Sequence, residues 1–343
     1  MSYLLIQHSS KILMAGLFIL VLTLIISPLT TKIGLVDKPN VRKSHDRNTP
    51  LAGGICIFLS CALALLIFND SWDQDFRNLF LAASLFLVLG ALDDQFDVKA
   101  KVKLLAQVII SFVFVVSSGL EVSSIGNFFG YERSYELGFL SIPFTLFAIV
   151  GLTNAFNMID GCDGLATSLV ALAILALSYF GSNHFGYSIN LFLLVLLANL
   201  SVFLFFNFSN NPKLKVFLGD GGSLFLGFTV AVLLVKFADG NQTNNPTMVL
   251  WFVAVPVYDL LAVVLRRLLL QRKIMVADKS HLHHWLLSIG LSHLQTTMII
   301  LVMAVALLCL GVLIETSYPS LSLFAFVGLF AVFLSIRSFG TKN

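Results

Sequence analysis

Long apolar runs, separated by short polar stretches, fill this chain of 343 residues from Ile12 to Ile336. A helix needs about 20 predominantly apolar residues to cross the hydrocarbon core of a bilayer. With 58% hydrophobic and only 11% charged residues, the chain has too few polar side chains to cover a water-soluble globule. The sequence therefore predicts an all-α polytopic membrane protein, with residues 1–343 forming a single integral membrane domain.

The polar interruptions divide the apolar runs into eleven expected membrane-spanning helices. Two runs, 78–92 and 222–237, are short for a span, so we expect their helices either to extend into the polar flanks or to stop short of the bilayer edge. The first run lacks a small-residue cleavage site and is interpreted as a retained helix. The spans are expected at 12–31, 51–68, 78–92, 104–119, 139–156, 164–181, 188–207, 222–237, 248–265, 296–315 and 320–336.

Basic residues predict the orientation, because Lys and Arg concentrate in cytoplasmic loops. Of the 21 Lys and Arg residues, all but four fall on one side of the predicted spans. We therefore expect the N-terminus outside and the C-terminus in the cytoplasm, with every motif below on the cytoplasmic side. The four residues on the other side are Lys11, Arg77, Arg133 and Lys236.

The sequence indicates neither a nucleic-acid partner nor a disulfide or zinc site formed by its cysteines. A formal net charge of +3 is too small to suggest a nucleic-acid partner. The cysteines have neither disulfide nor zinc spacing, since three lie in apolar runs and Cys162 stands alone in a loop motif.

One apolar run ends in two adjacent carboxylates, Asp93 and Asp94, followed by basic residues that include Lys103. Carboxylates about 4 Å apart repel by roughly 4 kcal/mol at an effective dielectric near 20. Such a pair favours a bound cation or a shared proton, and Mg²⁺ prefers oxygen ligands. The alternative is an ordinary solvated helix end.

A second run ends in a polar residue at every third position, a series made of Asn154, Asn157, Asp160 and Asp163. Neighbours in such a series share one helix face. Two glycines, at 161 and 164, let the chain leave the helix. Because polar side chains without partners are costly beside lipid, this series indicates a functional site more strongly than a chance loop.

Three further motifs supply a carboxylate, histidines and basic residues. Asp220 lies among glycines before a new span, where backbone N–H groups could hold phosphate and the carboxylate a metal, although such turns are common. A basic loop contains His281, His283 and His284; zinc binding lacks a completing ligand, so anion recognition fits better than zinc or a solvated loop. The loop with Lys43 and His45 suits a lipid phosphate, or simply sets topology.

Together, these motifs offer carboxylates for a metal, cations for phosphates and glycines for close backbone approach. This combination favours phosphoryl transfer, in which positioning and charge neutralisation provide most of the catalysis. A secondary transporter is the rival from another class, but its site should lie near the bilayer midplane, often within internal repeats. A membrane scaffold without chemistry is a third, more remote interpretation.

The motifs closely resemble those of the polyprenyl-phosphate N-acetylhexosamine-1-phosphate transferases, a membrane family with MraY, WecA and TagO types. The resemblance extends over roughly residues 30–295 and looks strongest to the WecA type. It implies that undecaprenyl phosphate attacks a UDP-amino sugar, giving undecaprenyl-diphospho-sugar and UMP, in the bacterial inner membrane with the active site facing the cytoplasm. It is carried by residues 36–39, 92–94, 154–161, 216–220 and 281–284.

The resemblance also suggests a metal, a donor and residue roles. Mg²⁺, or Mn²⁺ in its place, is expected on Asp94 and Asp220, and Asp93 is expected to activate the lipid phosphate. The donor is expected to be UDP-N-acetylglucosamine, serving O-antigen or a related surface polysaccharide. Departures at Lys279, Gly221 and Leu282 leave another N-acetylhexosamine open, and a homodimer stays open as well. Nucleotide, sugar and phosphate contacts are expected from Asn154, Asn157, Asp160, Asp163, Lys103, Arg266, His281, His283, His284, Lys43 and His45.

Overall fold

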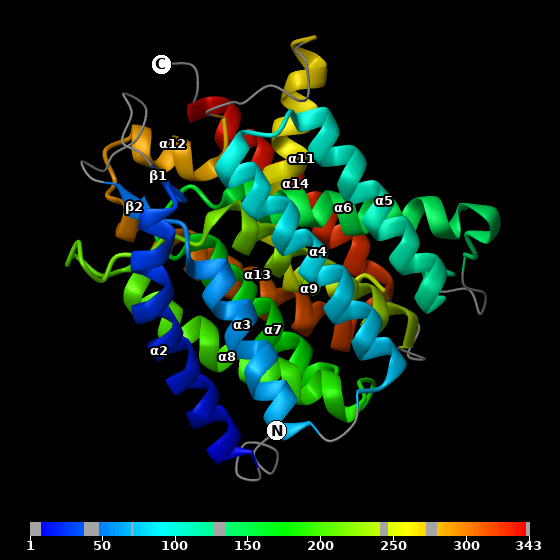
Figure 1. The fold of residues 1–343 in the computed structure, drawn as a ribbon. Helices are drawn as coiled ribbons and strands as arrows, with labels where there is room; N and C mark the ends of the chain where they lie inside the picture. The colour runs from blue at the N-terminus through cyan, green and yellow to red at the C-terminus, as the bar shows by residue number, and fades with distance from the viewer. Residues whose placement is uncertain are drawn as a thin grey trace.

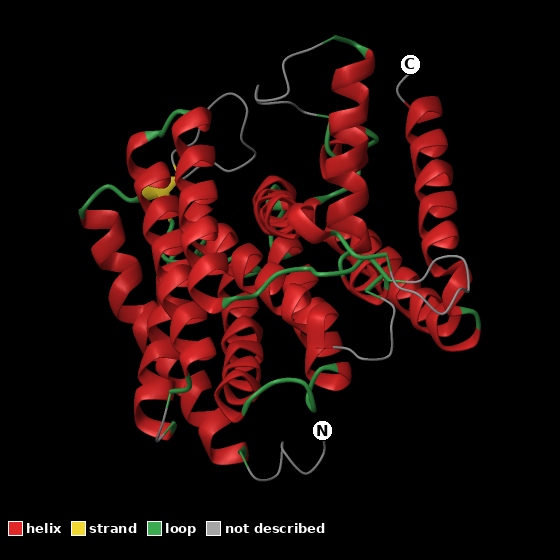
Figure 2. Ribbon diagram, turned by 90° about the vertical axis from the view of Figure 1, so that its right-hand side faces the viewer, coloured by secondary structure: helices red, strands yellow, loops and turns green. Residues whose placement is uncertain are grey.

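The computed structural model describes residues 8–37, 48–69, 72–126, 135–240, 246–271 and 280–340. These residues form a bundle of α-helices with one small sheet (Figure 1, Figure 2). The strands β1 (Val36–Asp37) and β2 (Thr49–Pro50) are antiparallel, with Val36 opposite Pro50. The α-helices are α2 (Ser9–Lys32), α3 (Gly53–Phe68), α4 (Gln74–Phe96), α5 (Ala100–Ser118), α6 (Ser141–Ile159), α7 (Leu165–Phe180), α8 (Tyr187–Asn207), α9 (Gly219–Gly240), α10 (Met248–Phe252), α11 (Ala254–Leu269), α12 (Leu282–Ser288), α13 (His293–Ser317) and α14 (Ser322–Gly340), and the 3-10 helices are η1 (Gly138–Leu140) and η2 (Pro319–Leu321).

Ten of the eleven predicted apolar runs each coincide with one of these α-helices. Eight helical segments in the described part of the chain are long and apolar enough to cross a membrane. The helices over the short runs extend into their polar flanks, as one of our two alternatives expected, since α4 has 23 residues and α9 has 22. Helices α3 and α7 are shorter, with 16 residues each.

The run at 248–265 is not one helix, because it breaks between α10 and α11 at Val253 (φ −130°, ψ 28°). Pro256 explains the break in part. Proline has no N–H and would leave the carbonyl group four residues earlier without its helical partner. In the structure Pro256 lies in the first turn of α11, where proline is tolerated because N–H groups there have no intrahelical acceptor.

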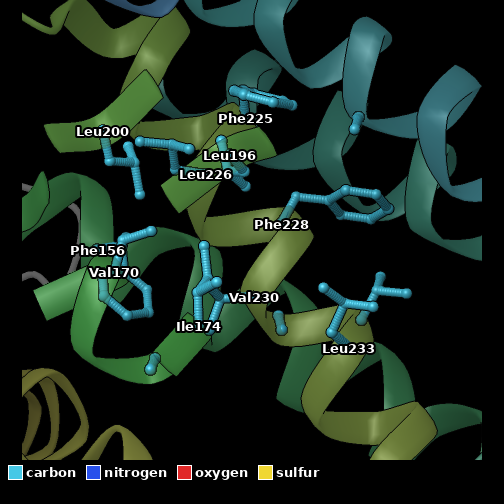
Figure 3. Close-up of a cluster of buried hydrophobic side chains, with 14 of the residues drawn as sticks. Phe156, Val170, Ile174, Leu196, Leu200, Phe225, Leu226, Phe228, Val230 and Leu233 are labelled. Carbon is cyan, nitrogen blue, oxygen red and sulfur yellow. The ribbon is translucent and has the colours of Figure 1, made fainter. Parts of the chain in front are cut away.

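Helix α9 forms the centre of the bundle, with 89% of its spanning window buried. Its apolar side chains point in several directions, and Phe225, Phe228 and Leu233 meet residues of the surrounding helices (Figure 3). A helix that is apolar on all sides is expected to be buried in this way. By contrast, only 11% of the spanning window of the last segment, which includes most of α14, is buried.

Glycines allow the N-terminal end of α9 to approach its neighbours closely. A Cβ atom at Gly90 of α4 would lie 2.3 Å from the Asp220 carbonyl oxygen, and one at Gly54 of α3 would lie 2.2 Å from the Gly222 Cα. Real Cβ atoms do not come so close to backbone, so glycine is required at these crossings. The close packing brings carboxylates of α4 and α9 to one place.

Candidate active site

Lys103 joins two of the predicted carboxylates. From the first turn of α5, its Nζ donates to Asp93 Oδ2 at 2.5 Å and to Asp220 Oδ2 at 2.6 Å. The Lys103 and Asp93 side chains are only 13% and 12% exposed. Burial strengthens the Coulomb attraction between the charges, although their removal from water offsets much of that gain. Residues 127 positions apart in sequence thus form one charged cluster.

Asn157 of α6 orients Asp220 in this cluster. Its Nδ2 donates to Asp220 Oδ1 at 3.0 Å and to Ser223 Oγ at 2.8 Å, while its Oδ1 accepts from Lys103 at 3.3 Å. Both the nitrogen and the oxygen of the Asn157 amide are therefore hydrogen-bonded, which fixes the orientation of this side chain. We call Asp93, Lys103, Asn157 and Asp220 the Lys103 cluster.

Asp94 binds the beginning of α9. Its Oδ1 and Oδ2 accept from the backbone N–H groups of Asp220 and Gly221, at 3.0 and 3.1 Å. A carboxylate at a helix N-terminus is stabilised by these N–H groups and by the helix dipole. Our expectation that the glycine-rich turn holds phosphate is thus wrong for these two N–H groups, because Asp94 takes them.

Asn154 is held by a residue that we had not selected. Its Nδ2 donates to Gln107 Oε1 at 2.6 Å and to the Val150 carbonyl oxygen at 2.8 Å. Gln107 is fully buried and lies one turn after Lys103 on α5. This pairing extends the polar contacts between α5 and α6 from the Lys103 cluster into the bundle.

The loop after α6 carries the last two acids of the series. Burial raises the pKa of Asp160 well above its usual value, and the nearby carboxylates of Asp220, Asp94 and Asp163 raise it further. Asp163 instead has a cationic partner, since Lys215 Nζ donates to its Oδ2 at 2.5 Å. Thr297 of α13 holds the Asp163 backbone by donating to its carbonyl oxygen at 2.9 Å.

The histidine motif packs under this loop. His283 is 1% exposed, and a Cβ atom at Gly161 would lie 2.1 Å from His283 Nε2. Burial, followed by the charge of His284, lowers the pKa of His283 to about 3. His283 is therefore neutral near pH 7. In this structure it supports the loop at Gly161, whereas we had expected it to contact substrate.

The remaining expected residues do not belong to the Lys103 cluster. Lys43 and His45 are outside the described residues. Arg266 is exposed near the end of α11, and within the described part of the chain it forms no ion pair with the Lys103 cluster. His281 is buried against Asp259, with 2.8 Å between Nδ1 and Oδ2.

Sequence reasoning missed Gln107, Lys215 and Asp259. Asp259 gave a usable signal, because it is an ionisable residue inside an apolar run and such residues usually have a specific partner or role. Lys215 gave none, because nothing in the sequence separates it from the other basic loop residues. Gln107 likewise becomes recognisable only when α5 packs on α6.

The donor set suits an oxygen-binding divalent cation. Three carboxylates, from Asp93, Asp94 and Asp220, converge here, and Lys103 is the cation that hydrogen-bonds to this group among the described residues. Among the described residues, no group of three or more His, Cys, Asp or Glu side chains is placed to hold a metal ion. Mg²⁺ is commonly held by one or two carboxylates together with substrate phosphates, so Asp94 and Asp220 fit that mode.

The site lies at helix ends. Asp93 and Asp94 are in the last turn of α4, Lys103 in the first turn of α5 and Asp220 in the first turn of α9. A transporter site is expected near the midplane, at broken helices. This placement therefore favours the enzyme interpretation over the transporter interpretation.

Comparisons with known proteins agree with this interpretation. The glycosyl transferase family 4 model matches residues 76–238. A probable undecaprenyl-phosphate N-acetylglucosaminyl 1-phosphate transferase of Bacillus subtilis is 34% identical over 90% of this chain and 85% of its own length. Undecaprenyl-phosphate alpha-N-acetylglucosaminyl 1-phosphate transferases of Yersinia pestis and Escherichia coli K12 are 33% and 34% identical, over 91% and 84% of this chain and 85% and 78% of their own lengths.

Proposed function

Because this chain belongs to glycosyl transferase family 4, we propose that it transfers N-acetylglucosamine-1-phosphate from UDP-N-acetylglucosamine to undecaprenyl phosphate. A phosphate oxygen of the lipid attacks the β-phosphorus of the donor, and the bond from that phosphorus to the bridging oxygen breaks. The products are undecaprenyl-diphospho-N-acetylglucosamine and UMP. We assign this reaction to the first step of O-antigen or related surface polysaccharide synthesis.

The Lys103 cluster is the observation that carries the proposal. Four helices contribute its residues, and each is held by at least one hydrogen bond to another helix. Phosphoryl transfer gains most of its rate from positioned charges of this kind, which need no reorganisation during the reaction. A buried set of linked charges at helix ends is also costly to keep without a function.

We assign roles according to what each group contacts. Asp94 and Asp220 would hold Mg²⁺ or Mn²⁺, which would neutralise the charge of the donor diphosphate. Lys103 orients Asp93 and Asp220 and supplies positive charge near the reacting phosphates. A phosphate monoester is largely ionised near pH 7, so Asp93 need only orient the lipid phosphate.

The loop from Asp160 to Asp163 is assigned to the nucleotide, together with Asn157. Its backbone is fixed by Thr297 and its glycine by His283, so this loop offers a positioned edge beside the Lys103 cluster. We assign sugar and phosphate contacts to Asn154, Arg266 and His284, and lipid phosphate contacts to Lys43 and His45.

The proposed topology has eleven membrane crossings, with the N-terminus outside and the C-terminus in the cytoplasm of a bacterial inner membrane. It is supported by the distribution of Lys and Arg along the sequence. A site at the cytoplasmic helix ends suits the two substrates, because the nucleotide sugar arrives from water and the polyprenyl phosphate from the bilayer.

A donor panel tests the proposal. Purified protein in lipid receives Mg²⁺, undecaprenyl phosphate and either labelled UDP-N-acetylglucosamine or labelled UDP-N-acetylgalactosamine. We expect the first donor to label the lipid fraction and to release UMP only when undecaprenyl phosphate is present. Faster labelling with the second donor would assign the chain to another N-acetylhexosamine, and no labelling with either would refute the proposed reaction.

A further inference from the structure

Asp259 is a buried acid outside the Lys103 cluster. It lies on α11, its side chain is 2% exposed, and each of its oxygens has a specific partner. Oδ2 lies 2.8 Å from His281 Nδ1, and Oδ1 accepts from the Leu282 N–H at 2.7 Å and from Arg337 Nη1 at 2.9 Å. A buried carboxylate without partners would cost several kcal/mol, so these contacts keep Asp259 charged inside the bundle.

Arg337 brings the last helix into this arrangement. Its Nη2 donates to the Ser280 carbonyl oxygen, and its guanidinium lies 5.7 Å from the Phe333 ring centroid on the same helix. The side chain is 11% exposed. A guanidinium can bind a carboxylate and a carbonyl oxygen at once because its N–H groups form a planar fork. Arg337 therefore joins α14 to the residue that precedes the histidine motif.

Other contacts hold α14 in register with α11 and α10. Trp251 Nε1 donates to Ser322 Oγ at 2.9 Å, and Tyr258 Oη donates to the Phe326 carbonyl oxygen at 2.6 Å. The Tyr258 ring also packs against Phe326, with 4.7 Å between ring centroids. These contacts lie along the same face of α14 as Arg337. The packing of α14 thus places the Arg337 guanidinium beside Asp259.

The Asp259 contacts determine the state of His281. Because a carboxylate only accepts hydrogen bonds, the proton must be on His281 Nδ1. Asp259 also accepts from Leu282, the first residue of α12, whose preceding residue provides no side-chain cap. One carboxylate therefore sets both the tautomer of His281 and the position where α12 begins.

A short series of contacts leads from His281 to the loop of the candidate site. The His281 and His283 rings are nearly parallel, at 12°, with 5.9 Å between centroids. His283 then lies directly against Gly161, next to Asp160. The C-terminal helix is thus connected to the nucleotide-side loop through Asp259 and two histidines.

We propose that Asp259 is a positioning residue for the transfer reaction and that Arg337 is its counter-charge. Asp259 holds His281 in the Nδ1–H form, fixes the start of α12 and so sets the place of His283 under Gly161. This inference rests on the proposed function for its catalytic consequence. It gives α14, a helix outside the matched family region, a part in forming the active site.

The test uses Asp259→Leu, Arg337→Met and the double variant Asp259→Leu/Arg337→Met. Asp259→Leu removes the acceptor of Arg337, His281 and the Leu282 N–H, and Arg337→Met removes the counter-charge of Asp259, so we expect both to lower the melting temperature. Replacing both members of a buried ion pair by apolar residues is often neutral for stability, so the double variant should recover the part of the melting temperature that is lost through the unpaired charge, but not the part that is lost with the His281 and Leu282 hydrogen bonds. If Asp259 positions His281, the double variant should still show at least a tenfold lower kcat.

Nitrogen NMR of protein with ¹⁵N-labelled histidine provides a readout independent of turnover. The His281 signal, identified by its loss in His281→Gln, should report Nδ1–H in the wild type and change in both Asp259→Leu proteins. Asp75→Asn is the matched control, because Asp75 pairs with Lys236 at 2.6 Å at the opposite end of α4 and should keep kcat and the His281 signal unchanged.

Two results would overturn the inference. They are a kcat within twofold of wild type in the double variant, which would make the pair purely structural, and an unchanged His281 tautomer in Asp259→Leu. Absence of lipid-dependent UMP release in the wild type would instead refute the proposed function. The melting temperatures and the His281 signal would then still decide whether Asp259 positions the histidine motif.

Discussion

Replacing Lys103 by Met removes the cation that joins Asp93 to Asp220. At an effective dielectric near 20, unit charges 2.6 Å apart attract by about 6 kcal/mol, but desolvation offsets much of this attraction. Breaking a buried ion pair costs about 3–5 kcal/mol. The Asp220 side chain is 38% exposed, so its contact is discounted for solvent screening, and we take the lower limit.

We equate this electrostatic loss with lost transition-state stabilisation, for which about 3 kcal/mol corresponds to a decrease in kcat/KM on the order of 10²-fold. The assay is UMP release from UDP-N-acetylglucosamine by folded Lys103→Met protein, with undecaprenyl phosphate present. We also expect half-maximal activity at a lower Mg²⁺ concentration, because Asp220, an expected metal ligand, loses a competing cation. Lys101→Met, an exposed neighbour on α5, is the matched control and should behave as wild type.

The reasoning about Lys103 would be wrong if Lys103→Met kept kcat/KM within about threefold of wild type. It would also be wrong if Lys101→Met lost activity equally, because the loss would then reflect general charge near the membrane surface. Lys103→Arg keeps the charge but changes its geometry. We expect that variant to lie between the wild type and Lys103→Met.

Three further changes test other parts of the site. Gly161→Ala should lower both the melting temperature and kcat, since its Cβ would lie 2.1 Å from His283 Nε2. Gly151→Ala is the control, because its Cβ would have no atom within 4 Å, and it should change neither quantity. Equal effects in both variants would contradict the packing of His283 against Gly161. The pKa of His283 is lowered to about 3 from an unfolded value near 6.5, so the contribution of His283 to stability should be full above pH 6.5 and should fall as the pH drops towards 3. In His283→Gln, the melting temperature should fall less over this pH range. A fall as large as in the wild type would count against a buried neutral imidazole. Chelation with EDTA should stop turnover, and added Mg²⁺ should restore it. Asp220→Asn should need a higher Mg²⁺ concentration than the wild type. Turnover that is insensitive to chelation would show that Asp94 and Asp220 do not bind a required metal.

The helices could largely be predicted from the sequence, because a bilayer requires long apolar segments whose backbone bonds are satisfied internally. The extension of the helices at 78–92 and 222–237 was one of the two alternatives that their short apolar runs left open. The break at Val253 was not predicted, although Pro256 gave a local signal. The tertiary context decided whether that proline would interrupt a helix or lie in its first turn.

The members of the Lys103 cluster could also be selected from sequence, because Asp93, Asn157 and Asp220 are polar residues beside apolar runs. The pairing of their atoms could not. That Asp94 binds the N-terminus of α9 depends on the close crossing at Gly90. The chain between Asp259 and Arg337 likewise contains no local pattern that predicts their contact, since only the packing of α14 on α11 brings them together.

The nature of the transferred group tests the central claim most directly. Purified protein is incubated with UDP-N-acetylglucosamine, Mg²⁺ and undecaprenyl phosphate, and the nucleotide and lipid products are identified by mass spectrometry. Transfer of sugar-1-phosphate predicts UMP and an undecaprenyl diphosphate carrying one N-acetylglucosamine, in equal amounts. Release of UDP together with an undecaprenyl monophosphate-linked sugar would contradict it, because the attack would then have occurred at the sugar carbon and not at phosphorus.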